Sequence, residues 1–226
     1  MIKSKIFDYE HPFVTTDAVV FALKTEEPNS NYRLPTTELR ILLYKRVKDP
    51  FKGRWCLPGG FLNIDELPED NIKRKLSEKS GVADCYLEQL YTFCDINRDP
   101  RARVLSICYL GLMSEADASG QEGWFSIEEI EQIKDELGFD HYKIIKTALS
   151  RLQGKLEYTD IVFNLLPEEF TLTQLQNVFN AILSEQKQYQ AAHFRRKIAD
   201  LVEETGQLTG EGRHRPAKLY RKREKS

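Results

Sequence analysis

One strand–loop–helix segment constrains the fold more than any other part of the chain. It contains Pro58-Gly59-Gly60, a combination that ends regular structure sharply after a short apolar run. Further on, Ile72 and Leu76 stand four positions apart, a spacing that predicts a helix over about 69–80. Gly81 then follows where a left-handed helix C-cap favours a residue without Cβ. We therefore expect a strand, a tight break, a polar loop and a capped helix in immediate succession.

Further strands and helices are expected on both sides of this segment. The β-rich runs are 14–23, 39–46, 87–94 and 104–113, and the helical patterns are a short acidic one at 127–135 and a longer one at 140–153. Proline and polar residues between the first two runs predict a long hairpin connection. Gly154 is expected to end the longer helix. A sheet flanked by two or three helices indicates an α+β chain with αβα layers.

The C-terminal part has a different pattern. Thr171 and Gln174 have the spacing of a capping box, which predicts the start of a helix. A second helix is expected over about 190–201, and the segments 207–209 and 217–220 can pair as a hairpin. Two helices and a basic hairpin predict a small winged helix-turn-helix.

The length of 226 residues fits two small domains. We place a first domain, an αβα sandwich, at 1–153, a linker at 154–166 and the winged helix at 167–226. The net charge of −2 is unevenly distributed between them. Residues 167–226 hold eleven Lys/Arg and eight Asp/Glu, a net +3, which leaves −5 for residues 1–166. This asymmetry favours an anionic partner at the C-terminal end.

The sequence lacks the signals of a membrane protein, a secreted protein and a zinc protein. No apolar run approaches the roughly 20 residues of a membrane span, and the first residues do not resemble a secretory signal. Cys56, Cys85, Cys94 and Cys108 form no CxxC pair, which favours reduced core thiols over a disulfide framework or a zinc site. We expect a cytoplasmic protein that does not interact with membranes and carries no cofactor or metal.

The strand–loop–helix segment resembles the Nudix box, whose spacing is G-x5-E-x7-R-E-U-x-E-E-x-G-U with U aliphatic. Seven of its nine defined positions agree here: Gly60, Glu66, Arg74, Leu76, Glu78, Gly81 and Val82. In an active box, a loop carboxylate and glutamates spaced i, i+3 and i+4 on one helix face hold Mg²⁺ or Mn²⁺ against a diphosphate.

The two departures from the box fall on its metal ligands. Lys75 and Lys79 stand where the motif has glutamates, and an ammonium group offers a divalent cation no oxygen ligand. Because Glu66 and Glu78 alone make a poor magnesium site, we expect a remnant box without catalytic residues and no useful hydrolysis. The two lysines either form a solvated helix face or pair directly with the diphosphate of a ligand that is bound without being cleaved.

Nearly the whole chain resembles the Nudix-related transcriptional regulators, which join a degenerate Nudix domain to a winged helix. The segments that carry this resemblance are Trp55–Phe61, Arg98–Pro100, Phe139–His141, Phe170–Leu172, Phe194–Arg196 and Arg215–Tyr220. The resemblance implies a homodimeric repressor that binds a palindromic double-stranded DNA operator. The sequence R-K-L-S-E-K at 74–79 is similar to the branch that controls NAD biosynthesis and salvage, which implies ADP-ribose or a related NAD metabolite as effector.

Candidate effector-binding residues are taken from the first domain. The Asp17 carboxylate can accept a hydrogen bond from an adenine or ribose group, and Arg46 ends a strand that can direct it at phosphate. The Arg98–Arg101 turn is a further candidate, and for each of these a cap or surface ion pair is the alternative. Trp55 fits either a stacking platform or core packing. His141 is isolated in the sequence and shows no metal-ligand spacing. The candidates are Asp17, Arg46, Trp55, Gly59, Gly60, Lys75, Lys79 and Arg98.

Candidate DNA-binding residues are taken from the second helix and hairpin of the winged helix. At 100° per residue, Arg196 lies nearly opposite the apolar side of its helix. In such motifs the helix enters the major groove and flanking basic groups contact phosphates. The candidates are His193, Arg195, Arg196 and Lys197 on the helix and Arg213, Arg215 and Lys218 in the wing. A solvated basic helix with a frayed tail is the alternative.

Other functions remain open from the sequence alone. One is an active Nudix hydrolase of the ADP-ribose pyrophosphatase type, which Lys75 and Lys79 argue against. Another is a regulator of sugar catabolism with a sugar effector, since other branches of similar proteins respond to sugars. A third is a metabolite sensor that acts through protein contacts, in which the basic helix is incidental.

Overall fold

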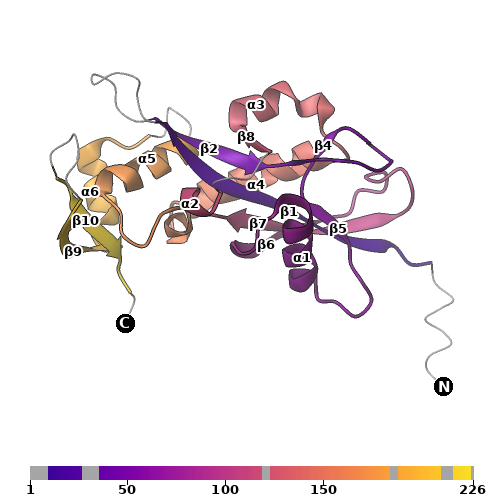
Figure 1. Ribbon diagram of the computed structural model, residues 1–226, viewed down its shortest axis with the longest axis horizontal. Helices are drawn as coiled ribbons and strands as arrows, with labels where there is room; N and C mark the ends of the chain where they lie inside the picture. Colours follow the sequence, from indigo (N-terminus) through magenta and orange to yellow (C-terminus); the bar gives the residue numbers. More distant parts are fainter. Residues whose placement is uncertain (1–9, 27–35, 119–122, 184–187, 210–215, 225–226) are drawn as a thin grey trace. The chain divides into compact units, whose positions relative to one another are not determined.

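The computed structural model describes residues 10–26, 36–118, 123–183, 188–209 and 216–224 (Figure 1). Within these residues, the main sheet has the strand order β6-β7-β1-β2-β8, and β5 also pairs with β1. The strands are β1 (Phe13–Glu26), β2 (Thr36–Leu42), β5 (Gly59–Phe61), β6 (Tyr86–Phe93), β7 (Val104–Leu112) and β8 (Trp124–Ser126). Residues 15–23 of β1 are all buried, as a central strand covered on both faces requires.

The predicted hairpin of the first two strands is confirmed. β1 and β2 are antiparallel from Phe21 opposite Ile41 to Glu26 opposite Thr36. The second run, predicted as one strand over 39–46, is divided: β2 ends at Leu42, and the separate strand β3 (Tyr44–Lys45) pairs with β4 (Trp55–Cys56). The change of partner after Leu42 explains the break.

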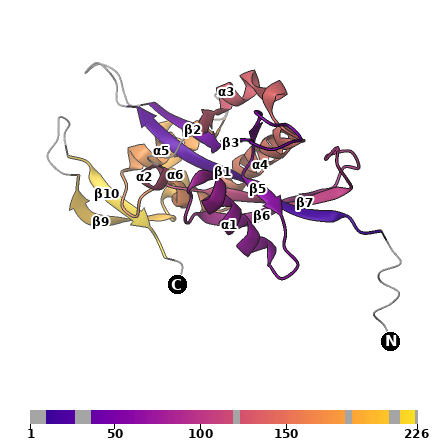
Figure 2. The ribbon, with the colours of Figure 1, turned by 45° about the vertical axis from the view of Figure 1, so that its right-hand side comes forward.

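The strand–loop–helix segment folds as predicted except at its glycines: Gly59 and Gly60, expected in a tight break, begin strand β5 because they pair with β1. β5 runs antiparallel to β1, with Gly59 opposite Asp17. Helix α1 (Pro68–Ser80) buries Ile72 and Leu76 and lies beside β5 in both ribbon views (Figures 1 and 2). Gly81 has φ 71° and donates its N–H to the carbonyl of Ser77, so it is the left-handed cap that the sequence indicated.

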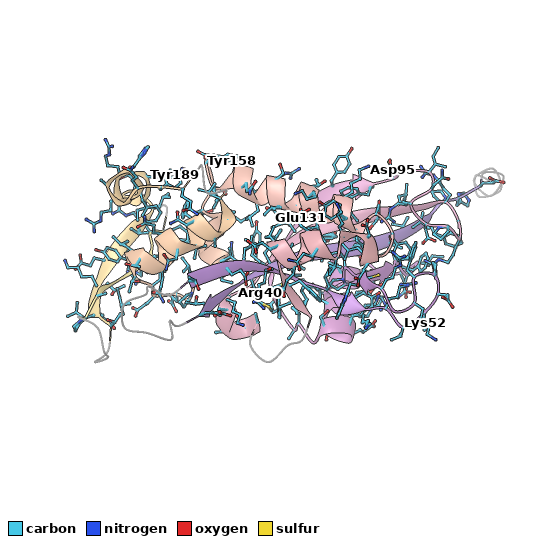
Figure 3. All side chains as sticks on the ribbon, turned by 90° about the horizontal axis from the view of Figure 1, so that it is seen from above. Arg40, Lys52, Asp95, Glu131, Tyr158 and Tyr189 are labelled. Atoms are coloured by element: carbon cyan, nitrogen blue, oxygen red, sulfur yellow. The ribbon has the colours of Figure 1, made fainter. Side chains whose placement is uncertain are left out.

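The helices that follow differ slightly from their predicted bounds. After α2 (Glu115–Ala118), the acidic segment forms α3 (Ile127–Gln132) and a 3-10 turn, η2 (Lys134–Glu136), rather than one helix. Helix α4 (His141–Lys155) includes Gly154 in its last turn, so Gly154 does not end it. Glu131 of α3, labelled in Figure 3, accepts hydrogen bonds from Tyr142 at 2.6 Å and Lys146 at 3.0 Å of α4. These bonds fix α3 against the first turns of α4.

The C-terminal elements form the predicted winged helix. Their bounds are η3 (Ile161–Leu165), which falls in the predicted linker, α5 (Leu172–Ile182), α6 (Ala191–Ile198), β9 (Val202–Leu208) and β10 (Lys218–Lys222). Thr171 and Gln174 form the capping box that opens α5. Phe179 of α5 and Phe194 of α6 pack edge to face with ring centroids 5.3 Å apart, and Tyr189, labelled in Figure 3, packs on both. β9 and β10 pair antiparallel.

The chain divides into two compact units. One contains residues 1–20, 42–111 and 121–148, and the other contains 21–41, 112–120 and 149–226. The domain boundary predicted in the linker at 154–166 therefore stays a prediction. In the described part of the chain, no helix is long and apolar enough to cross a membrane. All four cysteines are free; Cys56 and Cys108 are buried as expected, but Cys94 is exposed and is not a core thiol.

Candidate functional site

A cavity of about 340 Å³ lies within the first of the two units, a volume in the range of small-molecule sites. Strand β1 contributes Asp17, and the loop before α4 contributes Phe139. Its basic lining residues, among those described, are Arg46, Lys48, Lys75, Lys79, Arg98 and Arg101. The lining carboxylates are Asp17 and Asp99, so the cavity carries an excess of positive charge.

The first remnant carboxylate of the box is held by an arginine. Arg74 donates to both carboxylate oxygens of Glu66 at 2.7 Å, and Asn71 donates to Glu66 as well. The hydrogen bonds from Arg74, followed by that from Asn71, lower the pKa of Glu66 to about 2. Asn71 is itself buried and accepts from Thr16 at 2.6 Å, which anchors the box helix to β1.

The second remnant carboxylate is held in the same way. Glu78 accepts from Arg74 and from Lys75, both at 2.8 Å. An active Nudix box holds a divalent cation at these positions, but the residues present here do not fit one: two of the ligand positions are lysines, and both remaining carboxylates are paired with cations. No cluster of three or more His, Cys, Asp or Glu side chains that could hold a metal ion occurs among the described residues.

Lys79 lines the cavity next to the glycines of β5. It donates to the Tyr44 hydroxyl at 2.9 Å and to the carbonyl of Gly59, and it lies 4.3 Å from the centroid of the Tyr44 ring. Burial lowers the pKa of Lys79 to about 8, against the opposing attraction of Asp17. Lys79 is therefore predominantly an ammonium group at neutral pH.

Asp17 is a buried carboxylate that lines the cavity. Its Oδ2 accepts from the Ser106 hydroxyl at 2.5 Å and lies 3.7 Å from the Arg98 guanidinium. A Cβ on Gly59 would lie 2.1 Å from Asp17 Oδ1, so only glycine permits this approach of β5 to β1. Burial, opposed by the hydrogen bond from Ser106, raises the pKa of Asp17 to about 6.

Arg98 forms an ion pair, the alternative to ligand binding that the sequence left open, but this pair is buried and not on the surface. It is 7% exposed and donates to both oxygens of Asp140 at 3.1 and 2.8 Å. This bidentate pair fixes the loop before α4 to the Arg98–Arg101 turn. Arg98 borders the cavity, but its guanidinium is occupied by carboxylates.

Aromatic rings and arginines form one wall of the cavity. Phe139 packs against Phe51 with ring centroids 4.7 Å apart, and both residues have positive φ angles of 54° and 65°. The Arg46 guanidinium lies 5.0 Å from the Phe139 ring centroid, and that of Arg101 lies 6.0 Å away. Hydrogen bonds hold both guanidinium groups: Arg46 donates to the carbonyls of Pro50 and Asp49, and Arg101 donates to both carboxylate oxygens of Asp99. Cation–π attraction to Phe139 adds to these bonds.

Some basic residues of the winged helix are exposed without a carboxylate partner among the described residues, and others form ion pairs. On α6, Phe194 and Ile198 are buried, whereas His193, Arg195 and Arg196 are exposed, as the helical periodicity predicted. Lys197 is only partly exposed and lies 3.8 Å from Glu157. On β10, Lys218 is exposed but pairs with Glu204 at 2.9 Å. Arg213 and Arg215 lie outside the described residues.

Comparison with known proteins decides the family. The NUDIX domain model matches residues 32–148, and the model of the NrtR DNA-binding winged helix domain matches residues 162–222. The ADPR responsive transcriptional repressor NtrR of Acinetobacter baylyi is 34% identical over 226 residues, covering 95% of this chain and 83% of that protein. The chain belongs to the NrtR family of Nudix-related transcriptional regulators.

Solved structures and a second relative extend this result. Shewanella oneidensis NrtR in complex with a 27mer DNA has a TM-score of 0.74 and 35% identity, covering 93% of each chain. Its NUDIX domain in complex with ADP ribose has a TM-score of 0.51 and 30% identity, covering 66% of this chain and 94% of that one. An ADP-ribose pyrophosphatase of Methanocaldococcus jannaschii is 32% identical over 151 residues, covering 65% of this chain and 78% of that protein.

In this NrtR-family chain, the structure brings most of the predicted effector residues together. Asp17, Arg46, Gly59, Gly60, Lys75, Lys79 and Arg98 all line the cavity. Trp55 does not line it, because its ring packs on Phe125 with centroids 4.7 Å apart and lies under Lys45. Among further lining residues, Tyr44, Lys48, Phe139 and His141 were not predicted contacts, whereas Arg101 belongs to the predicted Arg98–Arg101 turn. The segment Phe139–His141, one of those that carry the family resemblance, was the sequence signal for Phe139 and His141.

Proposed function

We propose that this NrtR-family chain is a transcriptional repressor whose degenerate Nudix domain binds ADP-ribose, or a related NAD metabolite, without hydrolysing it. The winged helix binds the DNA operator, and occupancy of the cavity controls that binding. One observation supports the effector site most directly: cations without carboxylate partners line a cavity beside the remnant box, whose carboxylates Glu66 and Glu78 are already paired with cations.

The unpaired cations are suited to a diphosphate. Among the described residues, Arg46, Lys48 and Lys79 have no carboxylate within ion-pair distance, although all three border the cavity. Lys75, by contrast, is paired with Glu78 and contributes little free charge. Charge-assisted hydrogen bonds from Arg and Lys are the usual way in which proteins bind phosphate oxygens. We therefore assign the diphosphate to the Arg46, Lys48 and Lys79 side of the cavity.

The hydrolase function of the pyrophosphatase relative is the second candidate. It uses the same class of ligand, so a shared cavity is expected in both cases. Hydrolysis needs a divalent metal that activates water and neutralises the leaving phosphate. In this chain, Lys75 and Lys79 replace two of the ligands, and Arg74 and Lys75 occupy the carboxylates that remain. Binding without cleavage is the function that this donor set favours.

The DNA-binding function rests on α6. His193, Arg195 and Arg196 present an exposed basic side opposite a buried apolar one, the arrangement of a helix that enters the major groove. A homodimer is part of the proposal, because a palindromic operator presents two half-sites. Lys197 and Lys218, which are paired with Glu157 and Glu204, are expected to contribute less than the exposed arginines.

Calorimetry with ADP-ribose tests the effector site. The purified chain is expected to bind ADP-ribose in buffer with EDTA, because protein cations and not a metal hold the diphosphate. With Mg²⁺ or Mn²⁺ added, no release of AMP is expected over hours. The variant Lys75→Glu/Lys79→Glu, which restores the acidic box positions, should bind metal-free ADP-ribose at least tenfold more weakly, since each change reverses a charge.

Two results would contradict parts of the proposal. Metal-dependent turnover by the clean wild-type protein would assign it to the hydrolases. Unchanged ADP-ribose affinity in the double variant would show that the two lysines do not bind the diphosphate.

A further inference from the structure

His141 is a buried side chain whose proton position is fixed by the fold. It is the first residue of α4, is 3% exposed and lines the cavity. The backbone N–H of Leu57 donates to its Nδ1 at 2.9 Å. An Nδ1 that accepts carries no proton, so the proton of the neutral ring is on Nε2. Burial lowers the pKa of His141 to about 3, which keeps the ring neutral at physiological pH.

The Nε2–H group has no hydrogen-bond acceptor within the described protein. The nearest carboxylate oxygen, Oδ1 of Asp17, is 3.8 Å away, which is beyond hydrogen-bond length. Asp17 uses its other oxygen, Oδ2, to accept from Ser106. Nε2 of His141 and Oδ1 of Asp17 thus form a donor–acceptor pair in the cavity lining.

The spacing of this pair selects one kind of ligand group. An oxygen about 2.8–3.0 Å from both atoms fits between a donor and an acceptor that are 3.8 Å apart. That oxygen must accept from His141 and donate to Asp17, and a hydroxyl group does both through a single atom. A phosphate oxygen does not fit, because it has no proton for Asp17 and would lie beside a carboxylate.

We infer that His141 and Asp17 together bind one ribose hydroxyl of the ligand, and that His141 is thereby a specificity-determining residue. This inference rests on the proposed function and deepens it by separating two parts of the cavity. Arg46, Lys48 and Lys79 hold the diphosphate, while the His141–Asp17 pair distinguishes ligands by their sugar hydroxyls. Sites built to bind a hydroxyl reject analogues that lack it, because their buried polar groups are then left unpaired.

Binding of three ligands to the full chain tests the inference. ADP-ribose carries hydroxyls on both riboses, ADP lacks the distal ribose, and 2′,3′-dideoxy-ADP also lacks the hydroxyls of the adenosine ribose. The variant His141→Asn keeps an acceptor for Leu57 N–H but has no donor at the Nε2 position. The variant His141→Gln places an amide nitrogen close to that position and serves as the conservative rescue. Thermal unfolding verifies that each variant is folded.

The expected result is selective. His141→Asn should weaken ADP-ribose binding about tenfold and leave 2′,3′-dideoxy-ADP unaffected, with His141→Gln recovering part of the loss. A parallel loss for ADP would assign the hydroxyl to the adenosine ribose, and an unchanged ADP affinity would assign it to the distal ribose. If His141→Asn does not fold, His141→Phe, which keeps a ring but donates nothing, takes its place.

Two results would overturn the inference while leaving the proposed function intact. One is that His141→Asn binds all three ligands as the wild type does, and the other is that it weakens 2′,3′-dideoxy-ADP as much as ADP-ribose. A wild-type chain that binds none of the three ligands would overturn the proposed function, and this inference with it.

Discussion

At the scale of single residues, Lys79 shows how one substitution changes the chemistry of the Nudix box. A glutamate at this helix position would face a metal, whereas the Lys79 ammonium donates to the Tyr44 hydroxyl and the Gly59 carbonyl. Neither of these neutral acceptors cancels its charge. Burial makes that charge costly and lowers the pKa of Lys79 to about 8, so its protonation state changes close to physiological pH.

We predict that ADP-ribose affinity falls as the pH rises from 7 to 9. The bound diphosphate stabilises the Lys79 ammonium and raises its pKa, so binding above pH 8 requires proton uptake and weakens, by at most about tenfold per pH unit. Calorimetry at several pH values measures this trend. The control Lys79→Met should bind more weakly at pH 7 and show a flatter profile. Equal slopes in both proteins would place the titrating group elsewhere.

At the scale of elements, α6 combines two separate tasks on two sides of one helix. Phe194 and Ile198 are each 1% exposed and anchor the helix on α5 through Phe179. Arg195 and Arg196 are exposed and have no ion-pair partner among the described residues. Because the packing residues are buried and the arginines are exposed, substitutions on one side should leave the other intact.

We predict opposite outcomes for Arg196→Ala and Phe194→Ala. Arg196→Ala should abolish operator binding in fluorescence anisotropy, while the free energy of unfolding changes by less than about 0.5 kcal/mol and ADP-ribose affinity is preserved. Phe194→Ala should lower the free energy of unfolding of the winged helix by about 3–5 kcal/mol, because it leaves a cavity between α5 and α6. Unfolding of the Arg196→Ala protein would instead assign that arginine to the structure.

At the scale of the whole molecule, the proposed function couples two sites that lie in different parts of the chain. If ADP-ribose changes operator affinity, the operator must change ADP-ribose affinity by the same factor, since binding free energies are linked. We predict a coupling of about 5- to 150-fold. Anisotropy of labelled operator with and without ADP-ribose gives one factor, and calorimetry of ADP-ribose with and without operator gives the other.

The control for this coupling is the Lys75→Glu/Lys79→Glu variant. It should bind the operator normally and lose the response to ADP-ribose at concentrations that saturate the wild type. Independent binding of the two ligands to the wild-type chain would contradict the repressor mechanism, even if each ligand binds tightly.

Most of the elements were predictable because their signals are local. The capping box at Thr171, the glycine cap at Gly81 and the apolar spacing of Phe194 and Ile198 act over a few residues, and the structure confirms each of them. Local signals were weaker at element ends. Gly154 stays within α4, and the segment predicted as one strand over 39–46 changes partners after Leu42, because pairing and packing partners decide where an element stops.

The sequence by itself determined the family motif, the loss of the box glutamates at Lys75 and Lys79, and the basic side of α6. Only the tertiary structure decided which charges are free. It pairs Lys75 with Glu78 and Arg98 with Asp140, and it leaves Lys79 without a carboxylate partner among the described residues. It also brings His141 to Leu57, 84 positions away, and into the cavity lining beside Asp17. Charge pairing and burial depend on contacts between distant segments, which no local pattern specifies.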